Sequence, residues 1–307
     1  MMRGRILAVL LLAASGACSG GNDDTDSGAA QEAAGPSWET VQTLADRVAV
    51  VEGLSGPEAV RYDPDQDVWF IGNMNGGEAD GDGFITRVSA GTSEVEAPQF
   101  AVGTDEFPLH APRGMFLTGD TLWVADMYGV HGFHREDGRQ LRFVDLASFE
   151  PGFLNDIAQG PDGVLYVTDT GRSLVYRLGD EGTTIAVDGA QLGLPNGITW
   201  DESRGSFVLV PWEPDHRVHL WRPGEDPNGF GPATTPGRLD GIEPVDGRLL
   251  VASQSDSSLH IMDADGSHQV VRTPGAPADI GVDTRRRRVA VPYIALNRVD
   301  IWQLPEG

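Results

Sequence analysis

Six short segments of the sequence share one pattern: a variable residue, then a small or turn-forming residue, then an apolar residue that opens a strand. Their first residues are, in chain order, Glu58, Arg113, Asn155, Asn196, Asp240 and Ala278. Four of the six carry a carboxylate or amide oxygen, and none carries sulfur or imidazole. Such an all-oxygen set suits a hard divalent cation, and calcium rather than magnesium, because calcium accepts several protein oxygens while water completes its shell.

The predicted calcium ligands are Glu58, Asn155, Asn196 and Asp240. Asn-Gly, Asn-Asp and Asp-Gly are also ordinary turn sequences, so each Asn or Asp taken alone is compatible with a simple turn. Glutamate has no such turn role, and the shared register of all four residues indicates a metal site. The sequence leaves open whether calcium there is catalytic or structural.

The spacing of the six segments predicts the fold. They recur at intervals of about 40 residues, the first interval being longer. Each is followed by a short strand, a turn, an apolar strand and an alternating strand, which predicts an all-β fold, a six-bladed β-propeller, over residues 38–307. The six first residues then meet at the central axis. The last repeat lacks an outer strand, and we predict that residues 46–54 pair with it and close the ring.

The N-terminal region has the layout of a secretory signal. Two arginines precede a short apolar run and three small residues, which predicts a signal peptide at residues 1–17. Cys18, the single cysteine, follows directly and is the predicted site of lipidation, with ordinary cleavage and secretion as the alternative. Residues 18–37 are rich in Gly, Ala, Ser and Asp and predict a disordered tether. We expect an extracytoplasmic protein that contacts the membrane only through a lipidated Cys18.

The charge of the chain excludes some partners. The formal net charge is -24, and all 22 basic residues are arginine. An acidic surface repels nucleic acid and anionic membranes, so we expect neither as a partner. The arginine run at residues 285–288 falls at a predicted turn of the last blade, which favours a solvated turn over a nucleic-acid site. We expect a monomer that acts on a small-molecule substrate.

Substrate contacts and a base would have to lie on the face where the inner strands begin. The loops that join second to third strands open on this face, because the second strand runs antiparallel to the first. They place four candidate substrate contacts around the predicted mouth: Asp126, Asp169, Trp212 and Tyr293. Arg113 and Phe153 are two further candidate substrate contacts. His110 and His131 are the candidates for proton transfer, since histidine titrates near neutral pH. Asp240 is the alternative, as a nucleophile.

At residues 56–58, 155–156, 195–197 and 240–241, the sequence resembles the family of regucalcin and gluconolactonase. It resembles paraoxonase and diisopropyl fluorophosphatase more distantly. The resemblance extends over nearly everything after residue 38. It implies a six-bladed β-propeller with a Glu/Asn/Asn/Asp calcium site and hydrolysis of lactones or phosphotriesters.

Phe153 departs from the family pattern. Sugar-lactone members carry an arginine two residues before the Asn-Asp pair, and Phe153 stands at that position here. This favours a more apolar lactone or ester as the substrate. Arg113 either replaces the lost charge or pairs with Glu58 or Asp240. We therefore expect a calcium-dependent hydrolase of lactones or related esters. The alternative is a non-enzymatic extracytoplasmic propeller that binds a ligand or protein partner, with structural calcium or none.

Overall fold

The computed structural model describes residues 45–231 and 237–305, which belong to a compact unit spanning Thr40–Gly307. The predicted signal peptide, Cys18 and the tether lie outside the described residues and stay predictions. The described residues form six four-stranded sheets and three short 3-10 helices. None of the helices in this part of the chain is long and apolar enough to cross a bilayer.

Five of the sheets consist of four consecutive strands, and the sixth combines both ends of the described chain. Blade 1 contains β2 (Pro57–Asp63), β3 (Val68–Asn73), β4 (Phe84–Ser89) and β5 (Val95–Val102), and blade 2 contains β6 (Met115–Thr118), β7 (Thr121–Ala125), β8 (Gly129–His134) and β9 (Gln140–Asp145). Blade 3 contains β10 (Leu154–Gln159), β11 (Leu165–Asp169), β12 (Leu174–Gly179) and β13 (Gly182–Asp188), and blade 4 contains β14 (Pro195–Asp201), β15 (Ser206–Pro211), β16 (Val218–Trp221) and β17 (Asn228–Phe230). Blade 5 contains β18 (Leu239–Val245), β19 (Arg248–Ser253), β20 (Ser258–Met262) and β21 (Ser267–Arg272), and blade 6 contains β22 (Gly281–Asp283), β23 (Arg288–Tyr293), β24 (Arg298–Gln303) and β1 (Asp46–Val51). The 3-10 helices are η1 (Ala147–Phe149), η2 (Ala190–Leu192) and η3 (Ile294–Leu296).

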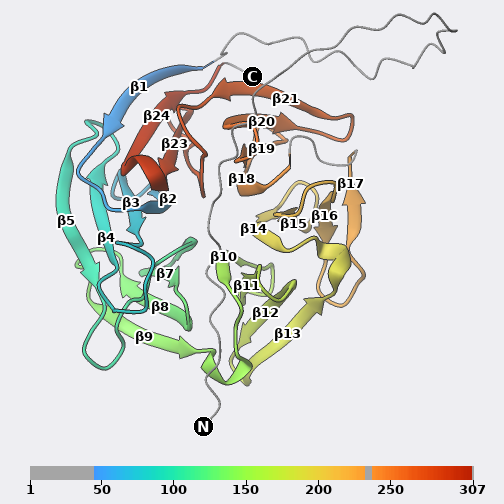
Figure 1. Ribbon diagram of the computed structural model, residues 1–307, viewed down its shortest axis with the longest axis horizontal. Helices are drawn as coiled ribbons and strands as arrows, with labels where there is room; N and C mark the ends of the chain where they lie inside the picture. Colours follow the sequence, from blue (N-terminus) through green and yellow to red (C-terminus); the bar gives the residue numbers. More distant parts are fainter. Residues whose placement is uncertain (1–44, 232–236, 306–307) are drawn as a thin grey trace, which may run out of the picture. The chain divides into compact units, whose positions relative to one another are not determined.

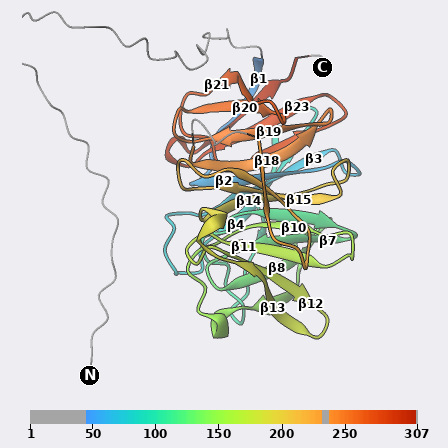
Figure 2. The same cartoon turned by 90° about the vertical axis from the view of Figure 1, so that its right-hand side faces the viewer.

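The six sheets are arranged around a common axis as the blades of a propeller (Figure 1). Strands β2, β10, β14 and β18 lie nearest the centre, and β5, β9 and β13 lie at the periphery. Figure 2, turned by 90°, shows inner strands such as β14 and β18 running roughly along that axis. The predicted all-β, six-bladed architecture is confirmed.

Strand β1 completes blade 6. It pairs antiparallel with β24, with Val51 opposite Val299. The predicted pairing of residues 46–54 with the last blade is thus present over Asp46–Val51. Val51 also packs in a core cluster with Val299 and Ile301, so β1 both covers the edge of β24 and buries apolar surface.

Apolar side chains fill the interfaces between blades. Phe207 and Trp221 of blade 4 stack with their ring centroids 5.4 Å apart, and Tyr166 of blade 3 lies 4.7 Å from Phe207. A single blade cannot bury both of its faces, so the six blades stabilise one another. The residues at the inner ends of the blades are consequently held in place by packing of the whole ring.

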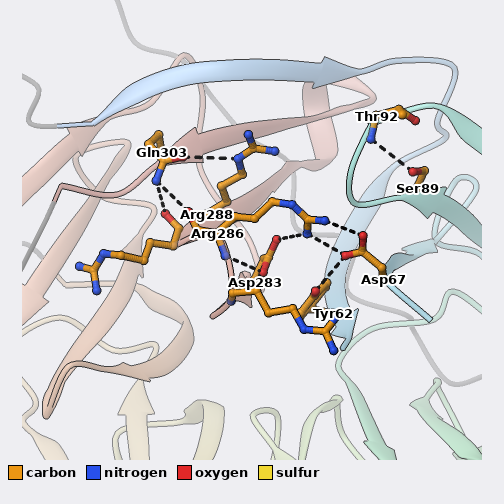
Figure 3. Close-up of polar contacts among 10 residues, drawn as sticks. Tyr62, Asp67, Ser89, Thr92, Asp283, Arg286, Arg288 and Gln303 are labelled. Atoms are coloured by element: carbon orange, nitrogen blue, oxygen red, sulfur yellow. Dashed lines mark hydrogen bonds and ion pairs between the residues drawn. The ribbon is translucent and has the colours of Figure 1, made fainter. Parts of the chain in front are cut away.

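The arginine run at residues 285–288 lies in the turn between β22 and β23 and at the first residue of β23, and two of its side chains pair with neighbouring blades. Arg286 donates hydrogen bonds to both carboxylate oxygens of Asp67 in blade 1, at 2.7 and 2.5 Å (Figure 3). Arg287 forms an ion pair with Asp246 of blade 5 at 2.7 Å. The predicted turn is confirmed and its arginines stay partly exposed, but the run also bridges blade 6 to both of its neighbours.

Candidate metal centre

In blades 1, 3, 4 and 5, the predicted ligand lies at a β-bulge of the innermost strand. In blade 3 the pairing skips from Leu154 to Ile157, so Asn155 and Asp156 together lie opposite one residue of β11. The same shift occurs at Glu58, at Asn196 and at Asp240. A bulge bends its strand and re-aims one side chain. Four copies of this irregularity explain how side chains from four blades share one orientation.

In blades 4 and 5, the residue after the predicted ligand is a glycine. The backbone of the next blade packs directly against it. A Cβ atom added to Gly197 would lie 2.2 Å from the carbonyl oxygen of Asp240, and one added to Gly241 would lie 2.4 Å from the backbone nitrogen of Ile280. Neither glycine has a positive φ. The Asn-Gly and Asp-Gly pairs therefore reflect close strand packing and not the simple turns considered as the alternative.

We call the six first residues of the repeats the hub ring. Its members are Glu58, Arg113, Asn155, Asn196, Asp240 and Ala278, and none is more than 5% exposed. Three buried hub oxygens have no hydrogen-bond partner among the described residues: Glu58 Oε2, Asn196 Oδ1 and Asp240 Oδ1. Buried polar atoms are almost always paired, because leaving them unpaired costs free energy. A hard cation would satisfy all three oxygens, so the donor set fits calcium.

The amide side chains are essential to this candidate site. The described residues contain no group of three or more His, Cys, Asp or Glu side chains that could hold a metal ion. The hub ring supplies two carboxylates, from Glu58 and Asp240, and two amides, from Asn155 and Asn196. Calcium accepts such neutral amide oxygens readily, whereas zinc prefers nitrogen and sulfur.

Two further side chains orient the predicted ligands. Asn155 Nδ2 donates to Thr170 Oγ1 at 3.1 Å, and this hydroxyl donates to the carbonyl oxygen of Pro195 at 2.8 Å. Gln254 Nε2 donates to Asp240 Oδ2 at 2.5 Å. The first bond uses the amide nitrogen and leaves Asn155 Oδ1 for the hub, and the second leaves Asp240 Oδ1. Neither Thr170 nor Gln254 was predicted from the sequence, although each directly follows the second strand of its blade.

We expect Thr170→Val to lower calcium affinity by roughly 10- to 100-fold, the usual effect of removing a partner that orients a metal ligand. The valine keeps the volume but frees the Asn155 amide to rotate. Calorimetric titration with calcium chloride measures the change. Thr273→Val is the matched control, because Thr273 is also buried and its hydroxyl donates to the backbone oxygen of Gly275 at 2.7 Å, after the outer strand β21. Equal affinity losses in both variants would contradict the orienting role.

Burial controls the charge state of the hub carboxylates. It raises the pKa of Asp240 to about 7, against hydrogen bonds from Gln254 and Asn196 that lower it. Burial, together with the neighbouring Asp240 carboxylate, also raises the pKa of Glu58 well above its usual range, while Arg113 acts in the opposite direction. Without a cation, the two carboxylates therefore resist carrying full charge together.

This arrangement predicts that the metal-free protein is less stable at pH 8 than at pH 5. The folded-state pKa of Asp240 is about 7, above its value of about 3.9 in an unfolded chain. The folded chain thus retains a proton that the unfolded chain releases, and stability is lost as the pH rises from about 4 to about 7. Thermal unfolding in a chelator measures the loss. Saturating calcium should reduce it, and an identical loss with calcium bound would contradict the assignment.

A second charged layer, missed in the sequence, lies further along the inner strands. Arg61 of β2 forms an ion pair with Glu243 of β18, and its guanidinium lies 3.7 Å from Asp279 Oδ2. Burial raises the pKa of Asp156 to about 6, while Arg61 lowers it. We call these four residues the channel layer. The one sequence signal for the channel layer is that Asp156 and Asp279 occupy a repeat position at which blades 2, 4 and 5 have glycine.

Three predicted substrate contacts lie inside the blades. Asp126 accepts a hydrogen bond from the backbone N–H of His110 at 3.1 Å, and Asp169 accepts one from the backbone N–H of Phe153 at 2.8 Å. Both aspartates are fully buried, and Tyr293 is 1% exposed. Side chains alternate along a strand, so these residues point into the blade and the next residue points to the mouth. This placement favours a structural role over contact with a substrate.

The two candidate histidines differ in their surroundings. His131 is fully buried, with Nε2 3.0 Å from Asp126 Oδ2 and Nδ1 2.8 Å from Gln140 Nε2. Neither ring nitrogen is therefore free for proton transfer. His110 packs edge-on against Tyr128, with centroids 5.4 Å apart, and its buried Nδ1 has no hydrogen-bond partner in the described part of the chain. His110 is the better placed of the two.

Arg113 and Phe153 form a stacked pair at the hub. The Arg113 guanidinium carbon lies 3.9 Å from the centroid of the Phe153 ring, and Nη1 donates to the carbonyl oxygen of Leu154 at 3.4 Å. Burial lowers the pKa of Arg113, and the Glu58 carboxylate opposes this shift more than any other group. Phe153 remains 42% exposed. Trp212 is half-buried and stacks on Arg238 at 5.8 Å.

Solved structures of other propellers match this chain over most of its length. A gluconolactonase from Xanthomonas campestris matches with a TM-score of 0.62 and 17% identity, covering 86% of this chain and 89% of that one. The chain shares its fold. Regucalcin from Agrobacterium tumefaciens, a calcium-binding protein, matches with a TM-score of 0.61 and 16% identity over 83% of this chain and 93% of its own. The virginiamycin B lyase from Staphylococcus aureus gives a TM-score of 0.59 and 13% identity over 84% and 99%.

These likenesses confirm the predicted resemblance to regucalcin and gluconolactonase at the level of the fold. No family model and no curated protein sequence matches the chain.

Proposed function

We propose that this chain is a calcium-dependent hydrolase of lactones or related esters. The cation would be held by the hub residues Glu58, Asn155, Asn196 and Asp240. The observation that carries the proposal is the set of buried hub oxygens without a hydrogen-bond partner among the described residues. Three of the four candidate ligands contribute one such oxygen, and their chemistry matches the preference of calcium for carboxylate and amide oxygens.

The chemistry follows from the residues around these ligands. When bound, the cation would polarise an ester carbonyl and stabilise the negative charge that develops on its oxygen. Arg113 adds a positive charge on the same ring, close to Glu58. His110, whose buried Nδ1 has no hydrogen-bond partner among the described residues, would transfer a proton to or from water. Asp240 is the alternative, attacking the carbonyl carbon as a nucleophile.

Two neighbours in fold support the proposal. One is a gluconolactonase, and the other is a calcium-binding regucalcin. We further propose that the protein works outside the cytoplasm as a monomer, either attached to the membrane through a lipidated Cys18 or secreted.

A panel assay tests the proposal. The purified protein is incubated with lactones and aryl esters in calcium, in excess chelator, and in chelator followed by excess calcium. We expect turnover of at least one substrate class, its loss in chelator and its recovery on adding calcium back. A folded, calcium-loaded protein without turnover on the whole panel would overturn the hydrolase and favour the propeller that only binds a ligand.

A further inference from the structure

A second ring of six equivalent positions surrounds the mouth above the hub ring. These positions, which we call the rim ring, directly follow the second strand of their blade, except in blade 2, where the position is the second residue after the strand: Met74, Met127, Thr170, Trp212, Gln254 and Ile294. Their equivalence rests on backbone hydrogen bonds to the chain segment that enters the inner strand of the same blade. In five blades the backbone N–H of the rim residue donates to a carbonyl oxygen of that segment. These bonds are Met74 to Gly56 at 3.0 Å, Met127 to His110 at 3.3 Å, Thr170 to Phe153 at 2.9 Å, Trp212 to Leu194 at 2.9 Å and Gln254 to Arg238 at 3.1 Å.

Ile294 occupies the rim position of blade 6 by register. The N–H of Ala278 donates to the carbonyl of Pro292 at 3.0 Å, as the N–H of Arg113 donates to the carbonyl of Ala125 at 2.9 Å. Counting two residues on from each acceptor gives Ile294 in blade 6 and Met127 in blade 2. All six blades therefore contribute one side chain to the rim ring.

Side chains of the rim ring point toward the hub ring. Gln254 reaches Asp240 at 2.5 Å, and Thr170 reaches Asn155 at 3.1 Å. Because the six positions are equivalent, the other four side chains border the same approach. Met74, Met127, Trp212 and Ile294 are half-buried, so part of each side chain is open to solvent. We therefore expect a molecule that approaches the hub oxygens from this face to contact these side chains.

The rim side chains of this approach are mostly apolar, although Arg238 stacks on Trp212 and Arg113 stacks on Phe153. Four of the six rim residues offer no charged or strongly hydrogen-bonding side-chain group, apart from the Trp212 indole N–H, and two of them are methionines, which adapt to irregular apolar shapes. Three exposed apolar side chains lie in loops of the same face: Tyr128 at 41%, Phe153 at 42% and Leu296 at 42% exposed. A polyhydroxylated lactone would lose hydrogen bonds to water here without finding enough partners.

We propose that the site selects esters or lactones that carry a large alkyl or aromatic group, and that Met127 and Trp212 bind this group. The selection rests on the proposed hydrolase function, but the binding preference can be measured without turnover. The rim ring thus determines specificity, while the hub ring binds the cation.

Binding of unreactive analogues provides the test. The calcium-loaded full chain is titrated calorimetrically with a decyl-substituted δ-lactam and with gluconolactam. We expect the decyl lactam to bind at least about 10-fold more tightly than gluconolactam. Trp212→Gln and Met127→Gln should each weaken binding of the decyl lactam by roughly 10-fold, the scale expected for losing a few buried methylene contacts. Ile185→Gln, at a 46% exposed residue of the outer strand β13, is the matched control and should change nothing.

The outcomes separate this inference from the proposed function. Tighter binding of the decyl lactam that depends on Trp212 and Met127, without turnover of any ester, would support the inference and overturn the hydrolase. Equal or tighter binding of gluconolactam would overturn the inference, even if esters were hydrolysed. Decyl-lactam affinity that is unchanged in both Gln variants would also overturn it.

Discussion

An Asp240→Asn variant is expected to bind calcium at least about 100-fold more weakly than the wild type and to lose turnover of the esters that the wild type hydrolyses. The substitution keeps the shape of the side chain but removes one of the two carboxylate charges in the candidate ligand set. Loss of a partner that only orients a metal ligand already costs up to about 100-fold in affinity, so loss of a charged ligand should cost more. Calorimetric titration with calcium chloride and initial rates on the ester panel measure both effects.

Glu58→Gln should behave in the same way, because its Oε2 atom is another buried hub oxygen without a partner among the described residues. Asp263→Asn is the matched control, since Asp263 lies in the turn between β20 and β21 and accepts a backbone hydrogen bond from Asp265 at 2.9 Å. That control should retain calcium binding and turnover. Wild-type calcium affinity in either hub variant would contradict the assigned ligand set.

Misfolding can be separated from ligand loss by stability measurements. Burial raises the pKa of Asp240 to about 7 in the metal-free protein. Removing a carboxyl group that resists ionisation should leave the metal-free Asp240→Asn variant at least as stable as the metal-free wild type above pH 7. Thermal unfolding in chelator at pH 8 tests this expectation. The wild type alone should then gain stability when calcium is added.

The second large effect is expected from Arg61→Leu, which should reduce the free energy of unfolding by about 3–5 kcal/mol. Arg61 is the cation of the channel layer, paired with Glu243 and 3.7 Å from Asp279. Its removal leaves these carboxylates, and nearby Asp156, buried without a compensating charge. Chemical denaturation followed by tryptophan fluorescence measures the loss.

The loss should depend on pH in a defined direction. Burial raises the pKa values of Glu243 and Asp279, and Arg61 opposes both shifts. Without Arg61, the folded protein holds these protons more tightly than the unfolded chain, so the variant should lose more stability at pH 8 than at pH 5. Adding Glu243→Leu to Arg61→Leu should recover part of the stability. A single variant as stable as the wild type at pH 8 would refute the role of Arg61.

The repeat allowed the fold and the hub positions to be predicted from the sequence. Glu58, Asn155, Asn196 and Asp240 share a register in the sequence because each occupies the same bulge of an inner strand. The close packing that requires Gly197 and Gly241 also produced the Asn-Gly and Asp-Gly pairs by which the register was recognised. At these residues, the pattern visible in the sequence has the same cause as their position at the hub.

Other features depend on geometry that the repeat does not encode. Along each second strand, a shift of one residue decides whether a side chain enters the blade or faces the mouth. Asp126 and Asp169 were therefore favoured over Met127 and Thr170, which follow them. Arg61 meets its partners only after blades 1, 5 and 6 have assembled, and no local pattern connects residues so far apart in the chain.

One hub-bound calcium ion and ester hydrolysis are expected to depend on each other. The most direct measurement determines calcium content by elemental analysis and lactone turnover on the same purified sample, before chelation, after chelation and after adding calcium back. We predict about one calcium ion per chain, as expected for a single ligand set of this size, with metal and turnover lost and restored together. Turnover that survives complete removal of calcium, or a fully calcium-loaded protein that hydrolyses no lactone or ester, would contradict a catalytic role for calcium at the hub.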